Sequence, residues 1–382
     1  MASDPVASVL TRAQRRRLAL VIVVSQLVLA LVTATAVYGV WQRLNGNIEP
    51  GGSIPSMSGG PAVESGPQQP LNILVLGTDA RDGAGDAIDG EAGCDCSDTT
   101  ILVHVAADRQ SAYGISIPRD ALVAPVACTE DHLYYGPGGA PTGLVEWNAA
   151  YSVGKAPCTA QQVQDDFGVP VDGYVVIDFQ GFKQMVDAID GVDVCIPFEL
   201  YDPKYAHADF KPGPAVHLDG TDALKYVRLR HAYDPVTGDY TLDGTDPGRI
   251  KRQQAFISAM IDKLFSESTL TRPDRLLSFA TALTGSITTN PELAHVSKLV
   301  DLGEQLKDID LQHIRFVSLP SRNYGPGAEE NRVEVLPAAY QLMKRVARDQ
   351  PLGRFAKGAR SAGGHHGRSA TKDADAAVGV CS

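Results

Sequence analysis

The chain has 382 residues, of which 44% are hydrophobic and 21% charged, and its formal net charge is −11. This composition is typical of a folded protein with one large core or two ordinary ones, and it excludes a largely disordered chain. The acidic balance argues against a general affinity for nucleic acid or for anionic membrane surfaces, so any bound polyanion needs a local cluster of Arg and Lys.

The N-terminus has the features of a membrane anchor. Arg12, Arg15, Arg16 and Arg17 precede an uncharged, largely apolar run over residues 18–41. About 23 residues at ~1.5 Å each span roughly 35 Å, enough to cross a bilayer core. The arginines predict a cytoplasmic segment 1–17, a transmembrane helix and an extracytoplasmic remainder. The alternative is a signal peptide cleaved at Ala34-Thr35-Ala36, which also places the folded body outside the cytoplasm.

The rest of the chain divides into three parts by composition. Residues 42–70 are rich in Gly, Pro and Ser, which predicts a flexible spacer. Residues 71–350 have the periodicity of a single folded domain. Residues 351–382 are rich in Gly, Ala, Lys, Arg and His without periodicity, which predicts a disordered tail.

Strands and helices are mixed along the domain. Short apolar runs predict strands at Leu71–Leu76, Thr99–Ala106, Ala112–Ile117, Tyr174–Phe179, Val192–Ile196 and Ile314–Leu319. Helical patterns cover Thr159–Phe167 with Thr159 as N-cap, Gly181–Ile189, a segment capped by Asp219 that runs to Val227, Arg249–Phe265, Asp274–Leu283, Pro291–Leu306 and Pro337–Arg348. The order predicts an α/β fold, a three-layer α/β/α domain with a central mixed sheet.

The cysteines suit an oxidising compartment. Cys128, Cys158 and Cys195 lie in the folded region and can supply one disulfide, whose pairing the sequence leaves open. Cys94 and Cys96 resemble half of a zinc site, but no second ligand pair follows at a zinc-like spacing.

Four segments place charged residues where a strand or helix ends. They contain Asp79 and Arg81, Asp98, Arg119 and Asp120, and the group Arg228, Arg230, Arg249 and Gln253. Ligands bind at such strand ends in open α/β sheets. Each residue also has an ordinary explanation, because Asp is common in turns and Arg in surface ion pairs.

Together these residues indicate a pyrophosphate site. Arg228 and Arg230 share a side if they are extended, and Arg249 and Gln253 share a helix face. Guanidinium groups make bidentate contacts with phosphate oxygens, and Mg²⁺ can bridge nearby carboxylates to the same phosphates. Asp120 is expected to hold Arg119 in place, whereas His104 and His231 have no evident partners in the sequence.

On these motifs the chain resembles the LytR-CpsA-Psr family of bacterial cell-wall glycopolymer ligases, particularly its actinobacterial members. The resemblance runs through Leu71–Thr78 with Asp79 and Arg81, Ser97–Thr99, Ile117–Asp120, Asn148–Tyr151, Tyr174–Phe198, Leu218–Arg230 and Asp246–Gln254.

The resemblance implies a hydrophobic pocket for a polyprenyl chain and a pyrophosphate held by arginines. The implied pyrophosphate ligands are Arg81, Arg119, Arg228, Arg230, Arg249 and Gln253, the implied Mg²⁺ ligands are Asp79 and Asp98, and the implied catalytic residues are Asp79, Arg119, Arg228, Arg230 and Arg249. The implied reaction is phosphotransfer: a peptidoglycan hydroxyl attacks the polymer-side phosphorus, and polyprenyl phosphate leaves. Asp79 is the candidate base.

The chain departs from the family pattern in three places. Glu146 and Trp147 stand where a basic residue often precedes the Asn-Ala-Ala-Tyr stretch, which implies the loss of one anion contact. The segment between Arg230 and Arg249 is long and acidic, as is the loop from Asp82 to Cys96, and both are candidates for selecting the polymer or the acceptor.

Three other functions compete with this interpretation. A polyprenyl-pyrophosphate phosphatase would use the same site with water as the acceptor. A non-catalytic wall-binding scaffold would need neither Asp79 nor the paired Arg228 and Arg230. A transcriptional role needs a DNA-binding fold, for which a cytoplasmic segment of about 17 residues is too short.

Overall fold

The computed structural model describes residues 12–55, 69–78, 96–129, 132–133, 143–243, 246–307, 309–324, 332–357 and 359–361. Two compact units follow one another along the chain, Met1–Gly46 and Asn47–Ser382. They are described in turn.

The first unit is the helix α1 (Arg12–Asn47), which is long and apolar enough to cross a membrane and is the only such helix among the described residues. Its hydroxyl groups are satisfied within the helix: Ser25 donates to the Ile22 carbonyl (2.9 Å) and Thr33 to the Leu29 carbonyl (2.9 Å). Such bonds matter in lipid, where no water can satisfy a polar group. The helix covers the predicted transmembrane span at residues 18–41.

The prediction of a flexible spacer at residues 42–70 is wrong for residues 42–55. Residues 42–47 continue α1, and β1 (Glu49–Pro50) pairs in parallel with β16 (Ile287–Thr289). The buried Ile48 and the half-buried Ile54 fasten the segment, because their apolar side chains outweigh the flexibility of the neighbouring glycines. Gly51 is needed there, since a Cβ would lie 2.3 Å from the Tyr174 hydroxyl. The rest of the expected spacer, 56–68, is outside the described residues.

The main sheet of the second unit is mixed, as predicted. Its described strands are ordered β1-β16-β9-β2-β3-β4-β17-β20. The further bounds are β2 (Leu71–Thr78), β3 (Ser97–Val105), β4 (Ala112–Ile117), β9 (Gly173–Asp178), β17 (Ile314–Ser318) and β20 (Arg360–Ser361). β2 pairs in parallel with β9 and β4 with β17, whereas β3 is antiparallel to both its neighbours. The carboxyl ends of β2, β4, β9 and β17 therefore meet the start of β3 at one edge.

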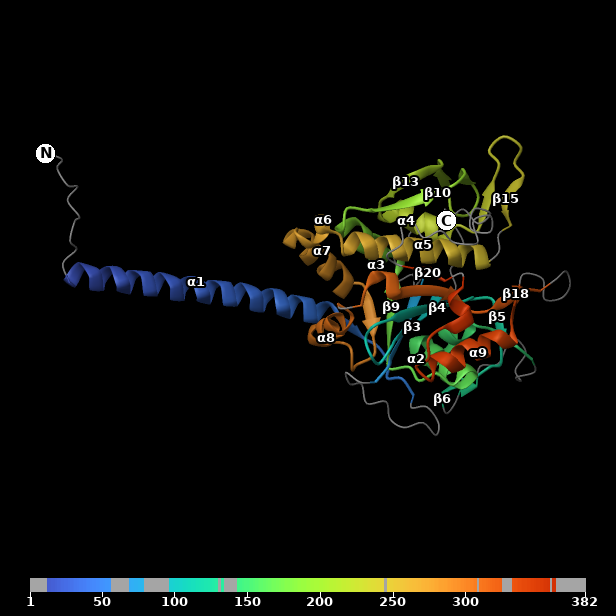
Figure 1. The fold of residues 1–382 in the computed structure, drawn as a ribbon, viewed down its shortest axis with the longest axis horizontal. Coiled ribbons are helices and arrows are strands. Elements are labelled where there is room, and N and C mark those ends of the chain that lie inside the picture. Colours follow the sequence, from blue (N-terminus) through green and yellow to red (C-terminus); the bar gives the residue numbers. More distant parts are fainter. Residues whose placement is uncertain are drawn as a thin grey trace. The chain divides into compact units, whose positions relative to one another are not determined.

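Helices cover both faces of this sheet, which confirms the three-layer fold (Figure 1). α2 (Ala149–Phe167) and α9 (Pro337–Val346) pack on the face that carries Leu74 and Leu76. The other face carries α8 (Val296–Leu306) over Ile73. A second apolar cluster lies among α3 (Phe179–Ala188), α4 (Gly220–Arg228) and α5 (Asp246–Leu264), and the remaining helical segments are α6 (Glu267–Leu270), α7 (Pro273–Thr284), η1 (Leu311–His313) and η2 (Gly353–Ala356).

Several short sheets accompany the main sheet. Among their strands, the sequence predicted the one at Val192–Ile196 and none of the others. β10 (Val192–Ile196) pairs with β13 (Gly213–Leu218). One four-stranded sheet has the order β12 (Ala208–Phe210), β11 (Leu200–Asp202), β14 (His231–Tyr233) and β15 (Tyr240–Asp243). A second has the order β18 (Ser321–Asn323), β19 (Val333–Val335), β5 (Ala121–Val123) and β8 (Val145–Glu146). The last pairs β6 (Ala127–Thr129) with β7 (His132–Leu133). The acidic segment between Arg230 and Arg249 thus contains the hairpin β14–β15. Strands of two to four residues carry too little periodicity to be recognised in the sequence.

Thr159 is not the N-cap that the sequence predicted. α2 begins ten residues earlier, after Asn148, and is interrupted at Gly154 and Lys155, whose φ and ψ are not helical. Pro157 follows the break, where its missing N–H costs least. The Thr159 hydroxyl instead donates to the Lys155 carbonyl at 3.1 Å. By contrast, Asp219 caps α4 as predicted and accepts from the Asp222 N–H at 2.9 Å.

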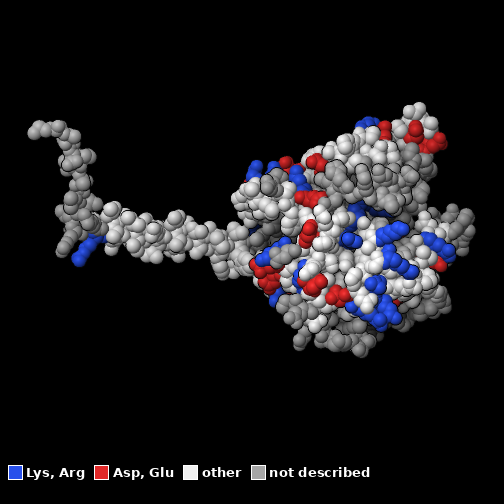
Figure 2. Space-filling view, viewed as in Figure 1, with Lys and Arg blue, Asp and Glu red and all other residues white. Residues whose placement is uncertain are grey.

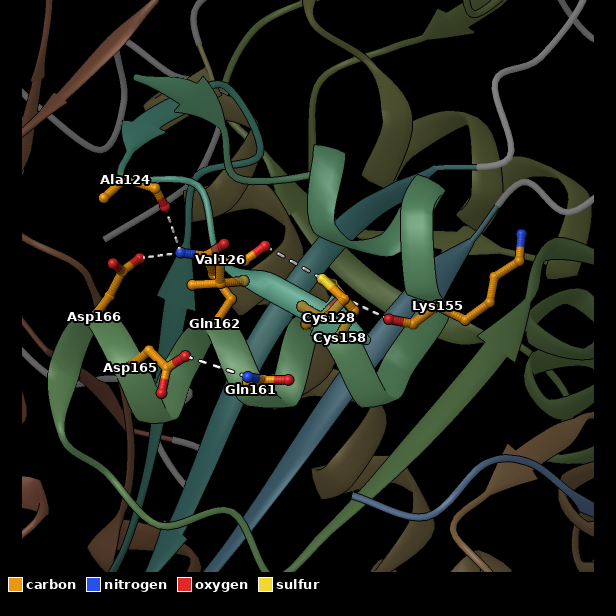
Figure 3. The surroundings of a disulfide bond; sticks show 10 residues. Ala124, Val126, Cys128, Lys155, Cys158, Gln161, Gln162, Asp165 and Asp166 are labelled. Carbon is orange, nitrogen blue, oxygen red and sulfur yellow. Dashed lines mark hydrogen bonds between the residues drawn. A yellow bond between two sulfur atoms is a disulfide. The ribbon is translucent and has the colours of Figure 1, made fainter. Parts of the chain in front are cut away.

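A disulfide joins the second half of α2 to β6 (Figure 3). It links Cys128 to Cys158, with 4.9 Å between the Cα atoms, and so selects one of the pairings that the sequence left open. One helical turn farther along, the Gln162 amide donates to the Ala124 carbonyl at 3.0 Å. Cys96 and Cys195 are disulfide-bonded as well. The described cysteines are all oxidised, as an oxidising compartment requires.

His104 has partners that the sequence did not reveal. Its Nδ1 lies 2.8 Å from Asn72 Oδ1 and its Nε2 lies 3.1 Å from Asp349 Oδ1. Burial, with a smaller contribution from the Arg109 guanidinium, lowers the pKa of His104 against the opposing effect of the Asp349 carboxylate. Next to this pair the Asn72 N–H donates to Asp172 at 2.7 Å, and burial raises the pKa of Asp172 to about 6.

Replacing Asp172 with Asn should therefore stabilise the protein above neutral pH. A carboxyl group with a pKa raised from 3.8 to about 6 keeps its proton in the folded state while the unfolded chain loses it, so its contribution to stability falls as the pH rises from about 4 to 6. The side chain of Asp172→Asn cannot ionise. The free energy of unfolding of this variant, relative to wild type, should therefore rise by about 2 kcal/mol from pH 4 to pH 8. Urea unfolding at both pH values measures this difference, and a constant difference would contradict it.

Candidate active site

A β-bulge places Asp98 at the edge of the sheet where the strand ends meet. Gly77 pairs with Thr99 and Thr78 with Ser97, so Asp98 is the extra residue of the bulge. Ser97 holds the bend, because its hydroxyl donates to the Thr99 carbonyl at 2.9 Å. Bulges re-aim side chains beside active sites. The local backbone therefore turns the Asp98 carboxylate away from the ladder.

Arg119 and Asp120 follow β4 directly and contact Asp98 across the edge. Arg119 Nη1 makes a short hydrogen bond to Asp98 Oδ1. Arg119 Nε also lies 3.2 Å from Asp120 Oδ1, so Asp120 holds Arg119 as the sequence predicted. Asp120 Oδ2 lies 3.4 Å from Arg230 Nη2. One carboxylate thus links two guanidinium groups from distant parts of the chain.

The first turns of α5 close the site from the other side. The buried Arg249 donates from Nη2 to the Asp98 carbonyl at 3.1 Å. Gln253 Nε2 donates to Thr99 Oγ1 at 3.0 Å and to the Val227 carbonyl at 3.2 Å. Arg249 and Gln253 therefore share a helix face, as predicted, and Gln253 joins β3 to α4.

The charges around Asp98 keep it ionised. Burial by itself raises the pKa of its carboxyl. The guanidinium groups of Arg249, Arg119 and Arg228 outweigh burial and leave the pKa of Asp98 below its ordinary value of 3.8. Arg228 is the last residue of α4 rather than part of an extended run, and its guanidinium lies over the Phe179 ring at 4.6 Å. The structure thus gathers Asp98, Arg119, Arg228, Arg230, Arg249 and Gln253 at one place.

Arg252 was not predicted to belong to the site, although its side chain is 1% exposed. It makes a short hydrogen bond to the carbonyl of Leu229, the residue between Arg228 and Arg230. Its position three residues after Arg249 was visible in the sequence. Nothing there distinguished a buried Arg from a solvated one.

The remaining predicted site residues, Asp79 and Arg81, lie outside the described residues. They follow Thr78, the last residue of β2, which is opposite Ser97 and one residue from the bulge. The buried Tyr151 hydrogen-bonds to the Thr78 side chain, and burial raises the pKa of its hydroxyl. Within the described ranges, no group of three or more His, Cys, Asp or Glu is placed to hold a metal ion.

Comparison with known proteins gives the relationship. Residues 53–347 match the LytR_cpsA_psr family. The chain belongs to this family. It is 30% identical over 213 residues to the polyisoprenyl-teichoic acid–peptidoglycan teichoic acid transferase TagV of Bacillus subtilis, covering 55% of this chain and 47% of TagV. It is 32% identical over 234 residues to the probable cell wall biosynthesis protein LcpB of Corynebacterium glutamicum, covering 60% and 50%.

The chain spans about half the length of these curated LytR_cpsA_psr relatives. Its fold matches the LytR-Csp2A-Psr enzyme from Actinomyces oris with a TM-score of 0.59 at 21% sequence identity, covering 78% of this chain and 96% of that one. At this identity the match supports the α/β/α fold alone.

One departure from the family pattern now has a structural explanation. Trp147 is fully buried, stacks on Phe167 with ring centroids 5.8 Å apart, and donates from Nε1 to Thr100 Oγ1 at 3.2 Å. It supports the site strand β3 from the core. Glu146 lies 2.6 Å from Arg332 in an ion pair. Neither Trp147 nor Glu146 therefore adds a positive charge to the site around Asp98.

Proposed function

We propose that this protein transfers a glycopolymer from a polyprenyl-pyrophosphate carrier to a peptidoglycan hydroxyl, forms a phosphodiester and releases polyprenyl phosphate. The observation that carries the proposal is the cluster of Arg119, Arg228, Arg230 and Arg249 around a single bulged strand end. The names of the relatives, which include a teichoic acid–peptidoglycan transferase, support the same class of reaction.

The charge balance of the cluster suits a pyrophosphate. Four guanidinium groups face the two carboxylates of Asp98 and Asp120, which leaves an excess of positive charge in a chain of net charge −11. Guanidinium groups are always charged and bind phosphate oxygens in a bidentate manner. The contact between Arg230 and Asp120 is long, at 3.4 Å, so exchanging this contact for one to a phosphate oxygen costs little.

The proposed chemistry is an in-line displacement at phosphorus. The acceptor oxygen forms a bond to the polymer-side phosphorus, and the bond from that phosphorus to the bridging oxygen breaks. Its electron pair leaves on polyprenyl phosphate, and the hydroxyl proton passes to a base, for which Asp79 is the candidate. The arginines stabilise the charge that develops on the phosphate oxygens, a contribution that is large in phosphoryl transfer.

The donor set near Asp98 fits a magnesium ion. Mg²⁺ is bound by one or two carboxylates together with substrate phosphate oxygens, and Asp98 is an ionised carboxylate beside the proposed phosphate site. Asp98 and Asp79 would hold the ion, which would neutralise phosphate charge. Arg119 occupies Asp98 Oδ1, so the second carboxylate oxygen is the one available for the ion.

Apolar residues on α3, α4 and α5 suit the carrier's hydrocarbon chain, and α4 and α5 also carry Arg228 and Arg249. Phe182, Val227 and Met260 from α3, α4 and α5 are only partly buried against the second apolar cluster. We place the polyprenyl chain along this wall. The membrane helix α1 would keep the domain at the bilayer surface, and the arginines in its first turns favour an extracytoplasmic domain.

The proposal is tested by incubating the purified full-length chain with a lipid-linked oligosaccharide and peptidoglycan fragments. Mass spectrometry should detect a peptidoglycan fragment joined to the oligosaccharide through a phosphodiester. Release of oligosaccharide phosphate without a joined product would instead indicate the phosphatase activity, and no change in the donor would favour the scaffold.

The magnesium proposal predicts a specific effect of Asp98→Asn. This variant keeps the shape of the side chain and loses the charge, so transfer should fall about 100-fold and higher Mg²⁺ concentrations should be needed for half-maximal rate. Transfer by the wild type should stop in EDTA and return with Mg²⁺. Unchanged turnover of Asp98→Asn together with resistance of the wild type to EDTA would exclude a magnesium site at Asp98.

A further inference from the structure

A second group of basic residues lies on the surface, away from the active site. Lys344, Arg345, Arg348, Arg354 and Lys357 fall within fourteen residues, from the last turns of α9 to the end of η2. We refer to these five residues as the basic strip. Figure 2 shows Lys and Arg side chains gathered over the part of the domain where Figure 1 places α9. In a chain of net charge −11 such a concentration is unusual.

The strip is not neutralised by neighbouring carboxylates. No ion pair of its five residues with Asp or Glu occurs within the described part of the chain. Asp349, the one acidic residue among them in sequence, is engaged elsewhere: its carboxylate lies 3.1 Å from His104 Nε2 and accepts from the Ala107 N–H at 3.2 Å. Four of the five side chains belong to exposed residues, so their charge is available to a partner.

Stabilisation of the α9 helix dipole explains only part of the strip. Basic residues in the last turn of a helix interact favourably with its C-terminus, which accounts for Lys344 and Arg345. The effect falls off within one turn, and Arg354 and Lys357 lie beyond the helix. Arg354 and Lys357 belong to the segment that follows Pro351. The Pro351 carbonyl accepts a hydrogen bond from Arg345 Nε at 2.6 Å, which ties this segment to α9.

The strip is remote from the proposed reaction. Asp349 contacts His104, six residues along β3 from Asp98, which corresponds to about 20 Å of strand. Asp349, which lies within the sequence of the strip, is therefore well removed from the pyrophosphate site. A ligand that uses both places must therefore be an extended polymer or must bind the strip independently.

We propose that the basic strip docks carboxylate-bearing peptidoglycan, the acceptor. The choice of peptidoglycan rests on the proposed function, whereas the presence of a polyanion-binding surface does not. Stem peptides repeat their carboxylates along the glycan, so several weak contacts at the strip would combine and raise the local concentration of acceptor hydroxyls. The chain's own residues 362–382 are a poor alternative partner, since Arg368 and Lys372 balance Asp373 and Asp375.

The test measures co-sedimentation of the full-length chain, in detergent and without any lipid-linked donor, with insoluble peptidoglycan stripped of its glycopolymers. The strip variant carries Lys344→Gln, Arg348→Gln, Arg354→Gln and Lys357→Gln. The control removes the same charge elsewhere, with Lys211→Gln, Arg272→Gln, Lys298→Gln and Lys307→Gln. We expect about tenfold weaker binding for the strip variant and less than a twofold change for the control. Amidation of the peptidoglycan carboxylates should weaken wild-type binding to the same extent.

Three results would overturn the inference. Equal binding by wild type and the strip variant would show that the strip has no docking role. Equal weakening by both variants would indicate a response to net charge alone. Loss of binding to phosphatidylglycerol vesicles, with peptidoglycan binding unchanged, would assign the strip to the membrane. Because no donor is present, none of these results depends on whether the protein catalyses transfer.

Discussion

Replacing Arg228 or Arg230 with Ala is expected to reduce glycopolymer transfer by about 100- to 1000-fold, because each removes a charged donor from developing phosphate charge. The fold should survive. Neither residue is fully buried: Arg230 contacts Asp120 at 3.4 Å, and Arg228 lies over the Phe179 ring. Initial rates of transfer with a labelled lipid-linked oligosaccharide measure the effect.

Two controls separate this effect from general loss of charge. Arg228→Lys keeps the positive charge but loses the planar, bidentate group, and should recover only part of the activity. Arg272→Ala removes an exposed arginine that pairs with Asp274 on the surface, and should leave transfer unchanged. Wild-type transfer by Arg228→Ala or Arg230→Ala would show that the pyrophosphate is bound elsewhere.

Replacing Arg252 with Ala is expected to lower the free energy of unfolding by about 3 kcal/mol. The guanidinium group is fully buried, donates to the Leu229 carbonyl and lies close enough to the buried Tyr226 to affect its pKa, which burial raises to about 12. Truncation leaves a cavity and a buried carbonyl without its donor. The loss should appear as a lower midpoint in urea unfolding.

The Arg252 effect should extend to activity, since Leu229 stands between Arg228 and Arg230. Arg252→Met fills most of the volume but lacks the donor, so it should lose about 1–2 kcal/mol and still transfer poorly. A variant at this position with an unchanged unfolding midpoint and normal transfer would mean that Arg252 neither supports the fold nor positions its neighbours.

The long elements of the fold were predictable because each has strong apolar periodicity. The central strands at Leu71–Thr78, Ser97–Val105 and Ala112–Ile117 and the helix Asp246–Leu264 confirm the expected layers. The gathering of Arg119, Arg228, Arg249 and Gln253 near Asp98 was also expected, since charged residues at strand ends meet at one edge.

Other features depend on tertiary contacts that leave little trace in the sequence. The bulge at Asp98 arises from a register shift between two strands, and a one-residue shift has no compositional signature. The pairing of Cys128 with Cys158 joins β6 to the second half of α2, after a break in the helix that the sequence did not reveal. Residues 48–55 resemble a linker in composition, yet Ile48 and Ile54 hold them to the domain.

The most direct test of the central claim is calorimetric binding of a short polyprenyl pyrophosphate to the full-length chain in detergent, compared with the matching monophosphate. Because four guanidinium groups surround the site, the pyrophosphate should bind at least about tenfold more tightly than the monophosphate, and Arg228→Ala should remove most of that preference. Equal affinity for the two ligands, or a preference that persists in Arg228→Ala, would contradict a pyrophosphate site at this cluster.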